Sequence, residues 1–118
     1  MKKVEIAERA KIFALEVIKL IDKLPKKTSS FVIGKQVLRS ATSIGANIVE
    51  GGGSVSKKEF VNFLSIARKS AIETNFWLEL LDESNLVDSI IISKFQNELL
   101  EITKIISSII LNTKSNLK

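Results

Sequence analysis

The chain has 118 residues with a formal net charge of +5, and it contains no cysteine, no histidine and no tyrosine. This length suits one domain, spanning residues 1–118, and is too short for two. Without Cys, His and Tyr the usual nucleophile–base pairs and the common zinc ligand sets are excluded, so we expect a protein that is not an enzyme and that needs no metal or cofactor.

Apolar residues at helical spacing predict a first helix over residues 3–24. They form two adjacent stripes, together wider than the roughly 100° that faces the core in a monomer. One stripe includes Ala7, Ala14, Ile18 and Ile21, and the other includes Ile6, Ala10, Phe13, Val17, Leu20 and Leu24. Pro25 is the only proline, and because it lacks a backbone N–H it should end the helix.

A second helix is predicted from Ser29 or Ser30, either of which is a good N-cap, to about Glu50. Its apolar side contains Ile33, Val37, Ala41, Ile44 and Ile48, and its polar side contains Lys35, Gln36, Arg39, Ser40, Ser43, Asn47 and Glu50. Gly45 weakens the helix, which predicts the close approach of another helix at this point. The glycines at 51–53 are expected to end the helix in the left-handed conformation.

The segment Ser56-Lys57-Lys58-Glu59 is a capping box, which predicts the start of a third helix. The connection before it is short, so the second and third helices should be antiparallel neighbours. Further along, Phe76-Trp77-Leu78 suits a core or a subunit interface better than a cofactor platform.

A fourth helix is predicted from Asp88 or Ser89 to about Asn112, with a stripe of Ile91, Phe95, Leu99, Ile102, Ile106 and Ile109. The run at 90–92 also suits a strand, but the helical spacing that follows favours a helix. The sequence therefore predicts an all-α fold, an antiparallel four-helix bundle. The first and fourth helices carry more apolar surface than one core uses, which predicts a homo-oligomer.

Neither a secretory signal nor a membrane span is expected. The first ten residues include no uncharged apolar stretch. The most apolar segment, Leu86 to Leu111, contains five charged residues, whereas a span needs about 20 mostly uncharged ones. The sequence therefore predicts a cytoplasmic protein without a membrane partner.

Small and polar residues are densest between Leu38 and Gly51. Arg39, Ser43, Asn47 and Glu50 fall on successive turns of one face, so that Arg39 and Glu50 could bond the polar groups between them. One interpretation is a surface that binds a ligand or partner. The other, which we favour, is a buried polar network that fixes the register of helices or subunits.

The motif Arg39-Ser-Ala-Thr-Ser-Ile-Gly-Ala-Asn-Ile-Val-Glu-Gly51, followed by Ser56-Lys-Lys-Glu-Phe60, Phe63-Leu-Ser-Ile-Ala67 and Ser70-Ala-x-Glu73, closely resembles the four helix bundle protein family. That family includes proteins encoded by intervening sequences in bacterial large-subunit ribosomal RNA genes and the accessory variability protein of diversity-generating retroelements. The resemblance covers nearly the whole chain, with the sharp signature in residues 38–78.

The resemblance implies an up-and-down protomer, assembled as a barrel-shaped homopentamer. It also implies binding of nucleic acid or of a nucleic-acid enzyme such as a reverse transcriptase, without catalysis. By position, the signature residues are Arg39, Ser43, Asn47, Glu50 and Gly51 on the second helix and Glu73 on the third. Glu50 and Glu73 could face each other as a pair of carboxylates, but a di-iron bundle also requires histidines, so a metal site is not expected.

Family members carry an aromatic residue and one or two arginines in the connection that here reads Gly52-Gly53-Ser54-Val55, so RNA binding through this loop is not expected. Residues 1–69 nevertheless hold fourteen Lys and Arg against six Asp and Glu, and residues 70–118 hold four against seven. The candidates for contact with nucleic acid are Lys35, Arg39, Lys57, Lys58, Arg68 and Lys69. No aromatic residue interleaves them, which favours salt-sensitive phosphate contacts over base stacking.

Two functions remain open from the sequence. The leading hypothesis is a non-catalytic oligomeric scaffold that binds structured RNA, DNA or a nucleic-acid-processing protein through a basic surface. The alternative is a protein–protein interaction module with no direct nucleic-acid binding.

Overall fold

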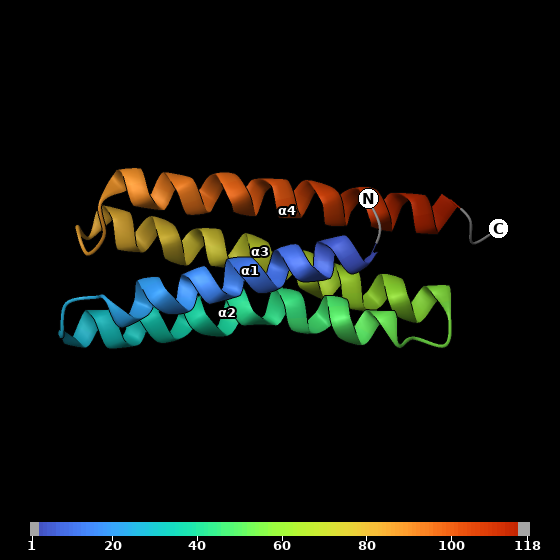
Figure 1. Ribbon diagram of the computed structural model, residues 1–118, viewed down its shortest axis with the longest axis horizontal. Helices are drawn as coiled ribbons and strands as arrows, with labels where there is room; N and C mark the ends of the chain where they lie inside the picture. Colours follow the sequence, from blue (N-terminus) through green and yellow to red (C-terminus); the bar gives the residue numbers. More distant parts are fainter. Residues whose placement is uncertain (1–2, 116–118) are drawn as a thin grey trace.

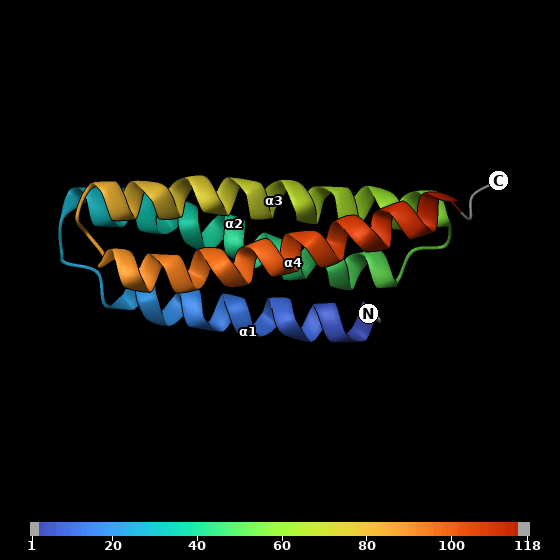
Figure 2. The same cartoon turned by 90° about the horizontal axis from the view of Figure 1, so that it is seen from above.

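A computed structural model describes residues 3–115, which form four helices. These are α1 (Lys3–Asp22), α2 (Thr28–Gly52), α3 (Lys57–Glu83) and α4 (Ser89–Ser115). Consecutive helices run antiparallel and pack side by side, and α1 also packs against α4, so the bundle is square in section (Figures 1 and 2). Its extents are 51 × 21 × 19 Å. The predicted all-α, up-and-down four-helix bundle is confirmed.

Side-chain caps start the third and fourth helices where the sequence predicts. The Glu59 amide donates to Ser56 Oγ over 3.1 Å, and the Ile90 amide donates to Asp88 Oδ1 over 2.8 Å. The prediction for α2 is wrong: this helix begins at Thr28, so both Ser29 and Ser30 lie inside its first turn. Lys27, the residue before Thr28, is extended and takes the N-cap position without a side-chain hydrogen bond, so no capping side chain marks this helix start.

The end of α2 also differs from the prediction. The helix continues through Gly51 and Gly52, and the capping residue Gly53 has φ −91°, so no described glycine is left-handed. The amides of Gly53 and Ser54 each donate three residues back, at 3.0 Å, and this tight last turn satisfies the end of the helix without a left-handed residue.

The core is formed by one stripe from each helix. In α1 it is the second predicted stripe, from Ile6 to Val17, that is buried, whereas Ile18 of the first stripe is 39% exposed. In α4 the stripe includes Ile92, which is fully buried, instead of the predicted Ile91, which is 42% exposed. Ile92 and Leu99 are seven residues apart and share a face, while Ile91 lies on another side of the helix.

Close approach of a second helix at Gly45 is confirmed. A Cβ built on Gly45 would lie 3.5 Å from the Ala10 Cβ, so α1 lies beside this position but leaves room for a methyl group at an ordinary van der Waals distance. Within residues 3–115, no helix combines the length and the apolar composition that crossing a membrane requires.

Candidate functional site

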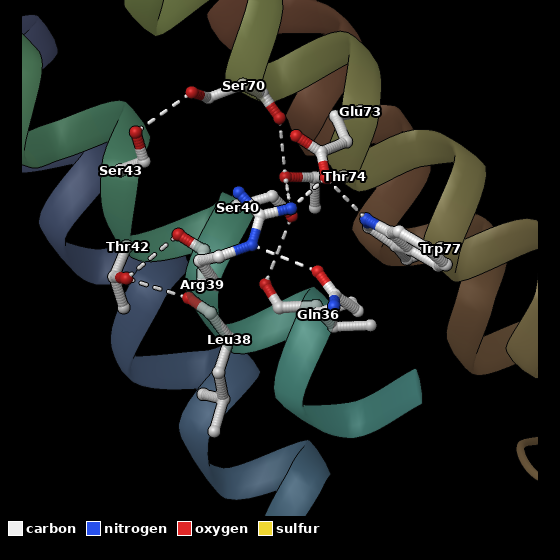
Figure 3. A network of polar contacts seen from close by, with 11 residues as sticks. Gln36, Leu38, Arg39, Ser40, Thr42, Ser43, Ser70, Glu73, Thr74 and Trp77 are labelled. Atoms are coloured by element: carbon white, nitrogen blue, oxygen red, sulfur yellow. Dashed lines mark hydrogen bonds and ion pairs between the residues drawn. The ribbon is translucent and has the colours of Figure 1, made fainter. Parts of the chain in front are cut away.

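A polar seam runs between α2 and α3 and contains most of the signature residues (Figure 3). The hydroxyls of Ser40 and Thr74 lie 2.8 Å apart and both side chains are fully buried. One turn further along α2, the hydroxyls of Ser43 and Ser70 lie 2.9 Å apart. Because the helices are antiparallel, each step forward on α2 meets a step backward on α3, so these two pairs fix the register of the hairpin.

The signature residue Asn47 belongs to the same seam. Its side-chain amide donates to the carbonyl of Ser43 over 2.8 Å and to Ser43 Oγ over 3.0 Å. Asn47 and Ser43 therefore bond within the protein, and this favours a network that fixes register over an open ligand surface. Ser40, which the sequence analysis assigned to the polar face, is completely buried, and the Thr74 hydroxyl is its hydrogen-bond partner across the seam.

The Arg39 guanidinium is held at the rim of the seam. Its Nε donates to Gln36 Oε1 over 2.9 Å, and a terminal nitrogen forms an ion pair with the Glu73 carboxylate. Trp77 Nε1 donates to the same carboxylate oxygen over 2.9 Å. The pKa of Glu73 lies below its ordinary value, mainly because of the Trp77 hydrogen bond, with Arg39 acting in the same direction against the opposing effect of burial.

Two expectations about this face are wrong. Arg39 does not bond Ser43 or Asn47, since it reaches instead to Glu73 across the seam. Nor does Glu50 face Glu73: Glu73 pairs with Arg39, and Glu50 lies eleven residues beyond Arg39 along α2, about 16 Å at 1.5 Å per residue. No group of three or more acidic residues able to hold a metal occurs in residues 3–115.

Gly51 has a packing role in the structure. It is buried, and a Cβ at this position would lie 3.1 Å from both Leu64 Cδ2 and Phe63 Cβ. These contacts are tighter than ordinary van der Waals separations. The close approach of α3 therefore explains why the smallest residue occupies this position.

The candidate nucleic-acid residues are spread over the bundle. Lys57 and Lys58 lie in the first turn of α3, whereas Lys35 lies near the opposite end, in the second turn of α2. Arg68 donates from Nε to Ser107 Oγ on α4 over 2.9 Å, and Lys69 beside it is exposed. Together with Arg39, which is paired to Glu73, these residues do not form one continuous patch.

The sequence analysis missed an ion pair between the first and last helices. Arg9 donates to both carboxylate oxygens of Glu98, over 2.7 and 2.9 Å, and this hydrogen bonding raises the pKa of Arg9. The two residues are 89 positions apart, so no local spacing could have identified the pair.

The fold and the seam define the protein as an antiparallel four-helix bundle with an internally bonded polar face between its second and third helices. The chain belongs to the 23S rRNA-intervening sequence protein family, whose model matches residues 2–108. The predicted family resemblance is thereby confirmed. A crystal structure from Bacteroides thetaiotaomicron VPI-5482, described as a protein with unknown function from the S23 ribosomal protein family, is 39% identical. It superimposes with a TM-score of 0.88, covering 93% of this chain and 98% of its own. No curated protein sequence matches this chain.

Proposed function

We propose that this protein is a non-catalytic homo-oligomeric scaffold that binds structured RNA or DNA, or a protein acting on them, through basic surface residues. The observation that carries the proposal is the exposure of large apolar side chains on a bundle whose core is already filled. Ile72, Phe76 and Leu100 are each about half exposed, at 52%, 52% and 53%. Apolar patches of this kind are typical of interaction sites.

Exposed apolar side chains occur on two opposite faces of the bundle. The α3–α4 face carries Ile72, Phe76 and Leu100, and Ile72 and Leu100 line a hollow of about 370 Å³ between the two helices. The α1–α2 face carries a hollow of about 670 Å³, whose lining includes the small residues Ala14 and Ala46, and it lies along the lower edge in Figure 1. The α3–α4 face of one copy against the α1–α2 face of the next is a heterologous contact, which forms a closed ring where the rotation between copies closes and an open filament where it does not.

A ring of this kind agrees with the five copies that the family resemblance implies. Light scattering at micromolar concentration and moderate salt tests it, with an expected mass of about five times the 13.1 kDa protomer. Ala46→Glu and Ile72→Glu should each dissociate the oligomer, because each places a charge in the apolar contact. Val55→Glu is the control, since Val55 is 93% exposed and lies in the connection between α2 and α3, outside both helix faces. A 13.1 kDa wild-type species would refute the assembly.

Three exposed lysines, at separate places on the bundle, supply the positive charge. Lys35, Lys58 and Lys69 are exposed and form no ion pair with any residue in the described part of the chain. Each phosphate contact adds about −0.9 on duplex, or about −0.7 on a single strand, to the slope of log affinity against log salt. Several copies in one assembly multiply this contribution, while Arg39 and Arg68 contribute less because they already have protein partners.

Filter binding with structured RNA at about 50 and about 200 mM salt tests this part of the proposal. Binding should weaken steeply between the two salt concentrations. The triple variant Lys35→Gln, Lys58→Gln, Lys69→Gln should bind less and show a shallower slope, whereas Lys104→Gln on α4 should behave as wild type. Absence of binding at the lower salt would remove nucleic acid as a direct ligand.

A second candidate is a protein-interaction module without direct nucleic-acid binding. The observation in its favour is the acidic corner where α3 ends and α4 begins, formed by Glu79, Asp82, Glu83 and Asp88. Copurification of a nucleic-acid enzyme that survives nuclease treatment and is lost in Glu79→Lys, Glu83→Lys would support this function. Loss of copurification on nuclease treatment would favour the nucleic-acid scaffold.

A further inference from the structure

The N-terminus of α2 has no side-chain cap. The amides of Thr28, Ser29 and Ser30 find no acceptor within the described part of the chain, and the first turn holds no acidic residue. In α3 and α4 one first-turn amide each is met by a side chain: Glu59 donates to Ser56 and Ile90 donates to Asp88. Uncapped amides at the positive end of a 25-residue helix favour an anion.

Ser30 provides a second, independent observation at the same corner. Its side chain is only 4% exposed, yet its Oγ has no hydrogen-bond partner. Ser30 also lines a hollow of about 340 Å³ between the end of α1 and the start of α2. A buried hydroxyl without a partner is rare in proteins and points to a group that binds there.

The charges around the hollow suit an anion. Lys26 and Lys35 line it, and Lys27 precedes the helix. None of the three forms an ion pair with any residue between 3 and 115. Asp22 at the end of α1 is the one carboxylate in the lining, so the surroundings remain net positive.

We propose that this corner binds a phosphate group, with Ser30 as a hydroxyl donor, the first-turn amides as backbone donors, and Lys26 and Lys35 supplying charge. Two sources share this chemistry: free inorganic phosphate and a phosphate of a polynucleotide. In the second case the inference rests on the proposed function and names one of its contacts. Each copy of an oligomer would carry one such corner at the same end of the bundle.

Titration of the full-length ¹⁵N-labelled protein with inorganic phosphate tests the site directly. The amide resonances of Thr28, Ser29 and Ser30 should shift along a saturating curve, and sodium chloride at equal ionic strength should not reproduce the shifts. Linear, non-saturating shifts that chloride reproduces would overturn the proposal, because they would report screening alone.

Three variants sharpen the result. Ser29→Asp keeps the fold, since an acid in the first turn stabilises a helix, but its carboxylate competes for the same amides and should abolish saturation. Ser30→Ala removes one hydrogen bond to a charged group and should weaken phosphate binding by about tenfold. Lys104→Gln removes a distant charge and should leave binding unchanged. Wild-type affinity in both Ser29→Asp and Ser30→Ala would overturn the site.

The source of the phosphate is decided by a second titration with a short single-stranded oligonucleotide, with and without a 5′ phosphate. Equal shifts with both forms assign a backbone phosphate, and shifts with the phosphorylated form alone assign a terminal one. Saturation by inorganic phosphate without any effect of the oligonucleotide supports the site with a small oxyanion as ligand, even if filter binding has refuted the nucleic-acid function.

Discussion

The hydroxyls of Ser40 and Thr74 meet between α2 and α3, 2.8 Å apart, and neither side chain is exposed to solvent. Each residue sits on a different helix, and each hydroxyl also bonds a carbonyl of its own helix: Thr74 bonds Ser70 over 2.7 Å and Ser40 bonds Val37 over 3.3 Å. This relationship couples the packing of the hairpin to one register, because a shift of either helix by one residue separates the two oxygens.

Thr74→Val tests that coupling. It preserves shape but leaves the Ser40 hydroxyl with only its 3.3 Å bond to the Val37 carbonyl, so the free energy of unfolding should fall by about 1 kcal/mol in urea denaturation. The double variant Ser40→Ala, Thr74→Val should lose less free energy of unfolding than the sum of the losses in the two single variants, since both partners are then apolar. Thr103→Val is a matched control, because Thr103 Oγ1 bonds only the Leu99 carbonyl of its own helix.

Glu73→Gln should change how stability depends on pH. Because the folded pKa of Glu73 is lowered, its carboxylate stabilises the fold above the unfolded pKa of about 4.3, and this contribution is lost as pH falls through the lower folded value. Urea midpoints of wild type and variant should therefore differ at pH 7 and converge in acid. The difference in the free energy of unfolding between wild type and variant should stay below about 1 kcal/mol, since the Arg39 and Glu73 side chains are 55% and 37% exposed. High salt should shrink it further; a difference unaffected by both pH and salt would contradict this account.

Gly51→Ala and Gly52→Ala form a matched pair at neighbouring helical positions. A Cβ at Gly52 meets nothing within 4 Å, so this change should raise the free energy of unfolding through helix propensity, by up to about 1 kcal/mol. A Cβ at Gly51 meets Leu64 and Phe63 at 3.1 Å. Gly51→Ala should therefore be less stable than Gly52→Ala by about 1–3 kcal/mol. Equal stability of the two variants would show that α3 shifts to accommodate the added Cβ at little cost in free energy.

The Arg9–Glu98 pair should contribute weakly to stability. Both side chains are about a third exposed, at 34% and 37%, which limits the expected coupling to about 1 kcal/mol or less. A double-mutant cycle with Arg9→Gln and Glu98→Gln measures it, and coupling should fall as salt rises. Coupling that persists at high salt would indicate a larger role in docking α1 onto α4.

Local chemistry made much of the fold predictable. The starts of α3 and α4 depend on Ser56 and Asp88, whose side chains cap amides two or three residues away, so a short stretch of sequence contains the whole interaction. The start of α2 was mispredicted because Lys27 occupies its N-cap without any side-chain cap, while the nearby Ser29 and Ser30, which suit that position, lie inside the helix.

The family signature was visible in the sequence, but the partners of its residues were not. Arg39 bonds Glu73, 34 positions away, instead of the nearer Ser43 and Asn47 that share its helix. The unpaired hydroxyl of Ser30 likewise became a candidate ligand group only once the fold had buried it beside Lys26 and Lys35.

By itself the sequence determined four helices, an antiparallel hairpin between the second and third, and membership of a family, because periodicity, side-chain caps and motifs are local properties. Tertiary structure alone decided that Ser40 is a core residue, that Gly51 is required by the approach of Leu64, and which basic residues remain unpaired. The physical reason is that the burial of a side chain and its pairing both depend on the neighbouring helix. Which turn of α3 lies against which turn of α2 is set only when the helices pack together.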